Sequence, residues 1–171
     1  MNERRHFLQT ATALGAVLAL QPLRAQEAAA PASPPAVPKR PPPLPAELVK
    51  EFVVAAHGDL AKTQSLLGEH PGLINATWDW GGGDFETALG GASHMGRREI
   101  AQFLLGQGAR PDLFVHAMLG HLEAVKAIIA ARPEALKCPG PHGIPLLVHA
   151  QKGGAEAAAV VDYLKGRSAA G

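Results

Sequence analysis

Apolar residues along the chain recur in a fixed relation to three glycines. A doublet of large apolar residues begins eight residues after each of Gly58, Gly96 and Gly120. Around the doublets, other apolar residues lie three and four positions apart, which is the spacing of one face of a helix. Because a constant offset that returns along a chain marks repeated units, the pattern predicts stacked helical repeats. The doublets are Leu66-Leu67, Leu104-Leu105 and Ile128-Ile129.

Each repeat is predicted to hold two short antiparallel helices, one on either side of the glycine. In the first and third repeats, Pro71 and Pro133 are expected to end the second helix, because proline cannot continue it. Asp112 is expected to cap the first helix of the third repeat. A fourth, less regular repeat is expected over residues 143–164.

The second repeat carries the most specific motif of the chain. It reads Thr87-Ala88-Leu89-Gly90-Gly91-Ala92-Ser93-His94-Met95-Gly96, followed by the Leu-Leu doublet and Gly108-Ala109. This resembles the ankyrin repeat, whose pattern is Thr-Pro-Leu-His-x-Ala-Ala-x-x-Gly, an apolar helix with a Leu-Leu pair, and Gly-Ala. The resemblance covers about residues 46–166. It implies an all-α, ankyrin-repeat-like solenoid of about four helix pairs over residues 46–171, with the outer pairs as caps.

Two departures from the ankyrin pattern change the picture. Ala88 and Gly90 stand where the family has Pro and His. The glycines between paired helices lie 38, 24 and 33 residues apart, whereas the family period is about 33. The longer step leaves room for an enlarged finger loop at residues 75–85, and the shorter step leaves none.

The first 25 residues have the order of an export signal. Arg4 and Arg5 precede an uncharged apolar run over residues 11–20, and small residues follow up to Ala25. The twin arginines resemble a twin-arginine translocation (Tat) signal, which implies recognition of this pair by the Tat export machinery. Residues 1–25 are therefore predicted to be a signal peptide, cleaved after Ala25 or Ala30. The mature protein is predicted to be periplasmic or secreted, with no membrane insertion, because ten apolar residues form a helix only about 15 Å long.

Residues 26–45 contain eight prolines among twenty residues. Such a segment buries no core and is predicted to be a disordered, extended linker. Its Pro-Pro-Pro-Leu-Pro end is also compatible with a ligand for a proline-binding groove.

Charge and cysteine content exclude two classes of function. Residues 46–171 carry 11 Lys and Arg against 13 Asp and Glu, a formal charge of −2 with no basic cluster. A nucleic-acid partner is therefore not expected. Cys138 is the only cysteine, so no internal disulfide can form, and its Pro/Gly-rich surroundings predict a turn between repeats.

The enlarged finger is the first candidate site. It holds both tryptophans of the chain on a glycine-rich loop, and large aromatic side chains at a loop tip are typical anchors of protein interfaces. The alternative is that the two tryptophans pack on the helices beneath. The finger residues predicted to bind a partner are Trp78, Asp79, Trp80, Asp84 and Phe85.

Positions just before the dividing glycines form the second candidate surface. In the ankyrin family these positions line the concave face beside the fingers, so the resemblance implies that they help to form a binding rim. They are occupied by His57, His94, Met95 and Met118, followed by Leu119. If they are exposed together, the methionines offer an apolar, adaptable patch for a partner protein.

The leading hypothesis is therefore an exported, non-catalytic protein that recognises an unidentified protein partner through its finger and concave face. No ligand-spaced histidine set and no Gly-x-Ser-x-Gly motif is present, so neither a metal, a cofactor nor a catalytic residue is expected. The competing hypothesis is a small periplasmic metal- or ligand-binding protein or enzyme. It would use His94, His116, His142 and Asp84. A structural spacer without a dedicated ligand is a third possibility.

Overall fold

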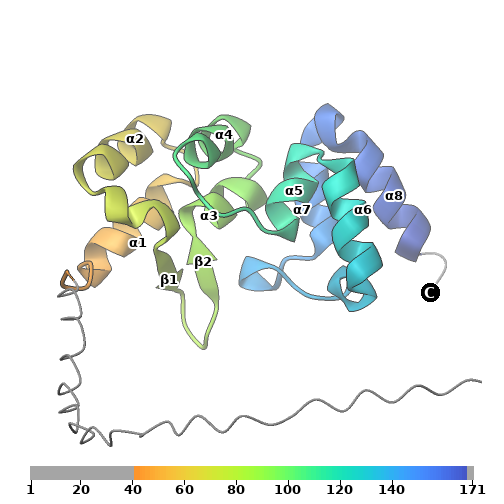
Figure 1. The fold of residues 1–171 in the computed structure, drawn as a ribbon, viewed down its shortest axis with the longest axis horizontal. Coiled ribbons are helices and arrows are strands. Elements are labelled where there is room, and N and C mark those ends of the chain that lie inside the picture. Colours follow the sequence, from red (N-terminus) through yellow and green to blue (C-terminus); the bar gives the residue numbers. More distant parts are fainter. Residues whose placement is uncertain (1–40, 169–171) are drawn as a thin grey trace, which may run out of the picture. The chain divides into compact units, whose positions relative to one another are not determined.

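Eight α-helices follow one another as four pairs within residues 41–168, the part of the chain that the structure, a computed structural model, describes (Figure 1). The predominance of helices confirms the all-α prediction. The predicted signal peptide and most of the predicted linker lie outside the described residues. The pairs are α1 (Ala46–Ala55) with α2 (Leu60–Glu69), α3 (Ala88–His94) with α4 (Arg98–Gly106), α5 (Leu113–Leu119) with α6 (Leu122–Ala131), and α7 (Leu146–Lys152) with α8 (Ala158–Ser168).

The first helices of the four pairs lie side by side in chain order. Helix α1 contacts α3, α3 contacts α5, and α5 contacts α7, while each second helix packs on the first helix of its own pair (Figure 1). Such an arrangement buries the apolar face of each pair mainly against its neighbours. None of the helices within residues 41–168 is long and apolar enough to cross a membrane.

The apolar doublets supply the core as the sequence predicts. One member of each doublet is buried, namely Leu67, Leu104 and Ile129, and the other member is half-buried. The buried side chains form two clusters, one around Phe52, Leu89 and Leu104 and the other around Val125, Ile129 and Leu164. The boundary between the two clusters falls along α5.

The predicted helix ends are also present. Helix α2 ends two residues before Pro71, and α6 ends two residues before Pro133; each proline begins a short 3-10 helix, η1 (Pro71–Asn75) or η2 (Pro133–Leu136). The Asp112 carboxylate accepts a hydrogen bond of 2.9 Å from the Val115 amide, so it caps α5 as expected. The Thr87 hydroxyl caps α3 in the same way, through the amide of Gly90 at 3.0 Å. Two further 3-10 helices, η3 (Pro141–Gly143) and η4 (Gly154–Ala157), flank α7.

The enlarged finger is a β-hairpin directly before α3 (Figure 1). Strand β1 (Thr77–Asp79) pairs antiparallel with β2 (Phe85–Thr87), and Trp78 lies opposite Glu86. Residues 81–83 are glycines that all have positive φ angles, which non-glycine residues rarely adopt, so the tip depends on glycine. The Asp79 side chain accepts hydrogen bonds from two of these glycine amides and holds the tip.

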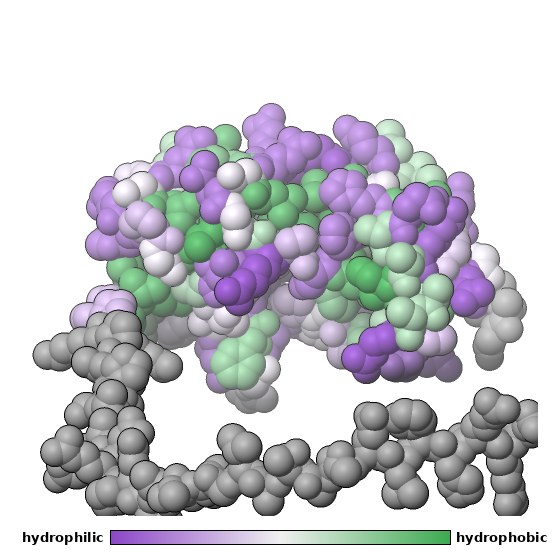
Figure 2. All heavy atoms as spheres, in the orientation of Figure 1, coloured by the Kyte–Doolittle hydropathy of each residue, from purple (hydrophilic) through white to green (hydrophobic). Residues whose placement is uncertain are grey.

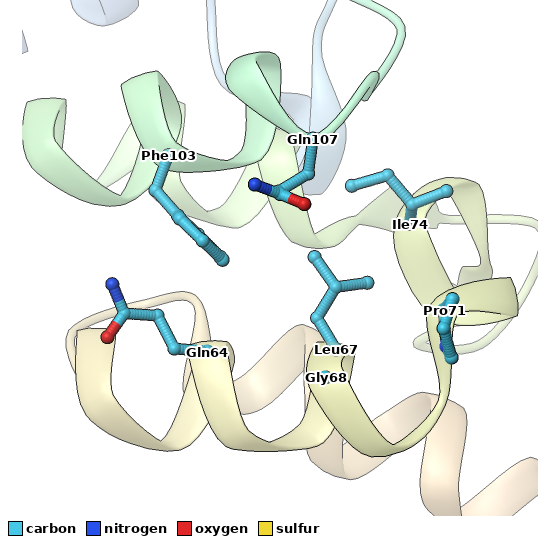
Figure 3. Close-up of a pocket in the computed structure, with 7 residues that line it drawn as sticks. All are labelled: Gln64, Leu67, Gly68, Pro71, Ile74, Phe103 and Gln107. Carbon is cyan, nitrogen blue, oxygen red and sulfur yellow. The ribbon is translucent and has the colours of Figure 1, made fainter.

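A groove lies between α2 and α4 (Figure 3). Leu67, Ile74 and Phe103 provide its apolar walls, and Gln64 and Gln107 are the polar side chains in it. None of the residues that line it is titratable or nucleophilic. The groove therefore offers neither acid–base nor metal chemistry.

Replacement of Gly120 by alanine should destabilise the fold. Gly120 has a φ of +80°, and an added Cβ would fall on the backbone oxygen of Glu156. The strained backbone and the collision together should lower the free energy of unfolding by about 2–4 kcal/mol, measured by denaturant unfolding.

Gly106→Ala is the matched control. Gly106 is the last residue of α4, and a Cβ there would meet nothing within 4 Å. This change should leave stability equal or raise it by up to about 1 kcal/mol. Equal unfolding free energies for the two variants would contradict the described packing of α5 against the segment before α8.

Candidate metal centre

Four side chains that are distant in the sequence converge beside the finger. They are His57, which follows α1, Glu86 on β2, His94 at the end of α3, and His142 in η3. One donor atom from each lies within 4.8 Å of the donor atoms of the others. We refer to these four residues as the His3Glu cluster.

The chain makes room for the cluster with two glycines on α3. A Cβ on Gly91 would lie 2.7 Å from the His57 ring, too close for any side chain other than hydrogen. A Cβ on the neighbouring Gly90 would meet the Glu86 side chain at 3.4 Å and Pro141 at 3.6 Å. The small residues of this helix therefore let an imidazole and a carboxylate approach its backbone.

The carboxylate of Glu86 lies at the bottom of the cluster and is wholly buried. Its Oε2 accepts a hydrogen bond of 2.9 Å from the Trp80 indole, and the Nε2 atoms of His57 and His142 each lie 3.4 Å from the same oxygen. Its Oε1 lies 2.9 Å from His94 Nε2, but the two are not aligned as a hydrogen bond, and no other group among the described residues bonds to Oε1. A buried carboxylate oxygen without a donor is costly, so this atom calls for a positively charged partner.

Two of the three histidines are held with Nε2 facing the cluster. His57 Nδ1 lies 2.8 Å from the Val53 carbonyl oxygen, and His142 Nδ1 lies 2.8 Å from Asp84 Oδ2. A carbonyl and a carboxylate can only accept, so each Nδ1 carries the hydrogen and, in the neutral ring, each Nε2 presents a lone pair. Carbonyl and carboxylate partners of this kind orient the histidine ligands of metals.

The backbone at His142 is also constrained. Its φ of +57° is the one positive value at a non-glycine residue among the described residues. Asp84 stabilises this conformation through two hydrogen bonds. Its Oδ1 accepts one of 2.8 Å from the His142 backbone amide, and its Oδ2 accepts one of 2.8 Å from the Nδ1–H of the ring. A left-handed backbone conformation is unfavourable at a residue other than glycine and persists only where surrounding contacts hold it. Such residues are often found at functional sites.

The charges in the cluster are strongly coupled. Burial raises the pKa of Glu86, but the nearby imidazoles of His57 and His94 and the hydrogen bond from Trp80 outweigh burial and hold that pKa far below its ordinary value. The hydrogen bond to Glu86 in turn raises the pKa of His57, against the opposing effect of burial. Hydrogen bonds from His142, that of its amide first, lower the pKa of Asp84. Glu86 is therefore an anion at neutral pH, surrounded by groups that can carry positive charge.

The structure brings together part of the residue set in the competing hypothesis. His94, His142 and Asp84 lie in or next to the cluster, whereas His116 does not and instead pairs with His121, with 3.0 Å between their Nδ1 atoms. Sequence reasoning missed Glu86 and did not assign His57 to a metal. The available signal was a carboxylate on the finger, next to a tryptophan and directly before a helix with two adjacent glycines.

The finger residues face in different directions. Trp80 turns its indole N–H toward Glu86, whereas Phe85 is 61% exposed, and Figure 2 shows apolar surface at the end of the finger. Trp78 packs against the first hydrophobic cluster, with Lys50 Nζ 5.3 Å from its ring centre. The Asp79 side chain accepts hydrogen bonds from two glycine amides and so stabilises the turn at the tip.

The expectation that Met95, Met118 and Leu119 share an exposed patch is wrong. Met95 is partly exposed, but Met118 and Leu119 are buried in the first hydrophobic cluster. The reason is that α5 lies between α3 and α7, so the end of α5 is covered from both sides. His94 is buried as well and faces the cluster rather than solvent.

A second buried histidine lies behind the cluster. His149 Nδ1 lies 3.1 Å from the Ser93 hydroxyl, which is 3.2 Å from the Phe114 carbonyl oxygen. His149 Nε2 has no hydrogen-bond partner among the described residues. Burial, helped by the nearby His94, lowers the pKa of His149 to about 4. Ser93 and His149 are both wholly buried, so this pair orders the interior and is closed to substrate.

No known family model matches the chain, and no curated protein is significantly similar to it.

Stability of the metal-free protein should fall in weak acid because of His149. Its folded pKa of about 4 lies below the value of 6.5 for an unfolded chain, so unfolding takes up a proton between these values. The contribution of neutral His149 to the free energy of unfolding is complete well above pH 6.5. It decreases as the pH falls and is lower by about 2 kcal/mol at pH 5.

The measurement is urea unfolding of the wild type and His149→Gln at pH 7.5 and pH 5.0 with a chelator present. The wild type should lose about 2 kcal/mol more than the variant between the two pH values. The exposed His70→Gln is the control and should behave as the wild type. A parallel loss in His149→Gln and the wild type would show that His149 is not buried in its neutral form.

Proposed function

We propose that the protein binds one divalent transition-metal ion, with zinc as the first choice, through His57, Glu86, His94 and His142. The observation that carries this proposal is the buried Oε1 of Glu86, which lacks a hydrogen bond although three histidine Nε2 atoms lie around the carboxylate. A cation bound between these atoms would satisfy the carboxylate and the lone pairs of His57 and His142, and it would displace the proton shared by the Nε2 atoms of His57 and His94, which lie 3.1 Å apart.

The donor set suits a borderline-soft cation. Imidazole nitrogen together with one carboxylate oxygen is typical of zinc and other late first-row metals, whereas calcium and magnesium prefer oxygen alone. Zinc–ligand bonds of about 2.0–2.1 Å place tetrahedral donors roughly 3.3 Å apart. His94 Nε2 lies 2.9 Å from Oε1 of Glu86, His57 and His142 Nε2 each lie 3.4 Å from its Oε2, and all four donors lie within 4.8 Å of one another, so side-chain shifts would have to draw the donors together around one ion.

The helical framework supports a repeat architecture around this site. We infer an ankyrin-like stack, because four consecutive helix pairs pack in chain order and a hairpin precedes α3. We also infer export through the twin-arginine pair, Arg4 and Arg5, to the periplasm or beyond. The inference of export rests on the sequence pattern alone.

A second candidate function is recognition of a partner protein by the outer side of the finger. Adjacent strand residues point to opposite faces, so Glu86 points inward while Phe85 points outward. Phe85, which is 61% exposed, provides a large apolar side chain of the kind that anchors interfaces. The same hairpin can therefore hold a metal on one side and contact a partner on the other.

Zinc binding can be tested by competition with a chromophoric chelator and by calorimetry on the full chain. The wild type should bind one equivalent of Zn²⁺. Loss of a group that only orients a ligand typically weakens metal binding by about 10- to 100-fold. His94→Ala removes a buried ligand itself, so it should weaken binding by more than about 100-fold. Asp84→Asn leaves all four donors but weakens the orientation of His142, so about 10- to 100-fold is expected.

The matched control is His116→Ala with His121→Ala, which removes two imidazoles outside the cluster. This double variant should keep the wild-type affinity. Absence of zinc binding by the wild type, or equal loss in the control, would refute the proposed site.

The partner function predicts that Phe85→Ala, on a properly folded protein, reduces the recovery of co-purifying proteins from the exported fraction. The change removes exposed apolar surface without touching a donor of the cluster. The control is Phe103→Ala, which alters the α2–α4 groove instead. Identical co-purifying proteins with the wild type and Phe85→Ala would remove the finger from partner recognition.

A further inference from the structure

Burial of the cluster is graded from one side to the other. The side chains of Glu86 and His94 are 0% and 9% exposed, and they form its floor. The side chains of His57 and His142 are 23% and 31% exposed, and they form its rim. An ion held by all four donors would thus have protein on the floor side and an approach from solvent on the rim side. Structural zinc sites are closed, whereas sites that exchange ligands keep a position open.

The Trp80 indole lies over that rim. Its ring centre is 6.2 Å from the His57 ring and 5.6 Å from the His142 ring. Its N–H is anchored to Glu86 Oε2 at 2.9 Å, so the indole is fixed in place although it is 39% exposed. The same hydrogen bond occupies one oxygen of Glu86. The carboxylate is thereby disposed to offer Oε1 alone, so the ion would have four protein donors and could take a fifth ligand by expansion to five-coordination.

The charge balance selects the kind of ligand that would enter. Three neutral imidazoles and one carboxylate leave a divalent ion with a charge of +1. The Asp84 carboxylate is already occupied by the two N–H groups of His142. A small anion would neutralise the centre, and the indole limits the size of what fits beneath it.

We propose that the ion bound by the His3Glu cluster keeps one exchangeable position on its rim side, and that this position takes a small anion beneath Trp80. The inference rests on the proposed function. It makes Trp80 a specificity-determining residue that excludes bulky anions.

The test uses the full chain loaded with Co²⁺, whose visible absorption reports the coordination number. Titration with azide should change the spectrum of the wild type with one-site saturation, while benzoate should have at least about 10-fold weaker effect. Trp80→Ala should lose this discrimination between azide and benzoate. Trp80→Phe keeps an aromatic wall but releases Oε2 of Glu86, so it should still favour azide over benzoate while binding azide more weakly than the wild type does. Trp78→Phe, which alters the tryptophan packed on the core, should behave as the wild type.

The outcomes separate the two proposals. Uptake of Co²⁺ with a spectrum that azide leaves unchanged would overturn the exchangeable position and leave metal binding intact. Equal binding of azide and benzoate by the wild type would overturn the role of Trp80. No uptake of Co²⁺ or Zn²⁺ would overturn the proposed function and this inference together. If Trp80→Ala fails to fold, Trp80→Leu replaces it: this variant keeps an apolar side chain without the flat ring and should lose the discrimination, whereas an unchanged preference for azide would overturn the role of Trp80.

Discussion

The buried carboxylate of Glu86 determines how four segments of the chain pack together. Removal of a charged group from water costs several kcal/mol unless donors or a cation replace the water. Around Glu86, these groups come from the end of α1, the finger, the end of α3 and η3. His57, Trp80 and His94 belong to segments packed around the first hydrophobic cluster, whereas His142 precedes α7, which belongs to the second. The need to satisfy one buried anion therefore ties the two halves of the described chain together.

Much of the fold could be predicted because its signals are local. The apolar doublets fall on helices and bury one member each, Asp112 caps α5, and proline follows the ends of α2 and α6. The long step between Gly58 and Gly96 predicted the extra hairpin. The burial of Met118 could not be predicted in this way, because it depends on α5 lying between two other helices. Contacts between neighbouring helix pairs depend on packing in three dimensions, which the sequence of a single pair does not specify.

The site was less accessible to sequence reasoning. Its four donors are separated by 29, 8 and 48 residues, so they form no short motif. Glu86 stands one residue beyond the predicted finger and was given no role, and Gly90 looked only like a departure from the ankyrin pattern. In the structure, Gly90 and Gly91 provide the space that the carboxylate and the His57 ring occupy. The left-handed backbone of His142, which turns its ring toward the cluster, is a property of tertiary contacts with Asp84. In the sequence, the histidines suggested metal binding. Their contacts with Glu86 and Asp84 became evident only in the three-dimensional structure.

The most direct measurement of the central claim is a crystal structure of the full chain grown with Zn²⁺, with anomalous data above and below the zinc absorption edge. The account predicts one strong anomalous peak about 2.0–2.2 Å from Nε2 of His57, His94 and His142 and from an oxygen of Glu86. A peak at His116 and His121 in its place, or no peak in a crystal whose four side chains stand as described, would contradict it.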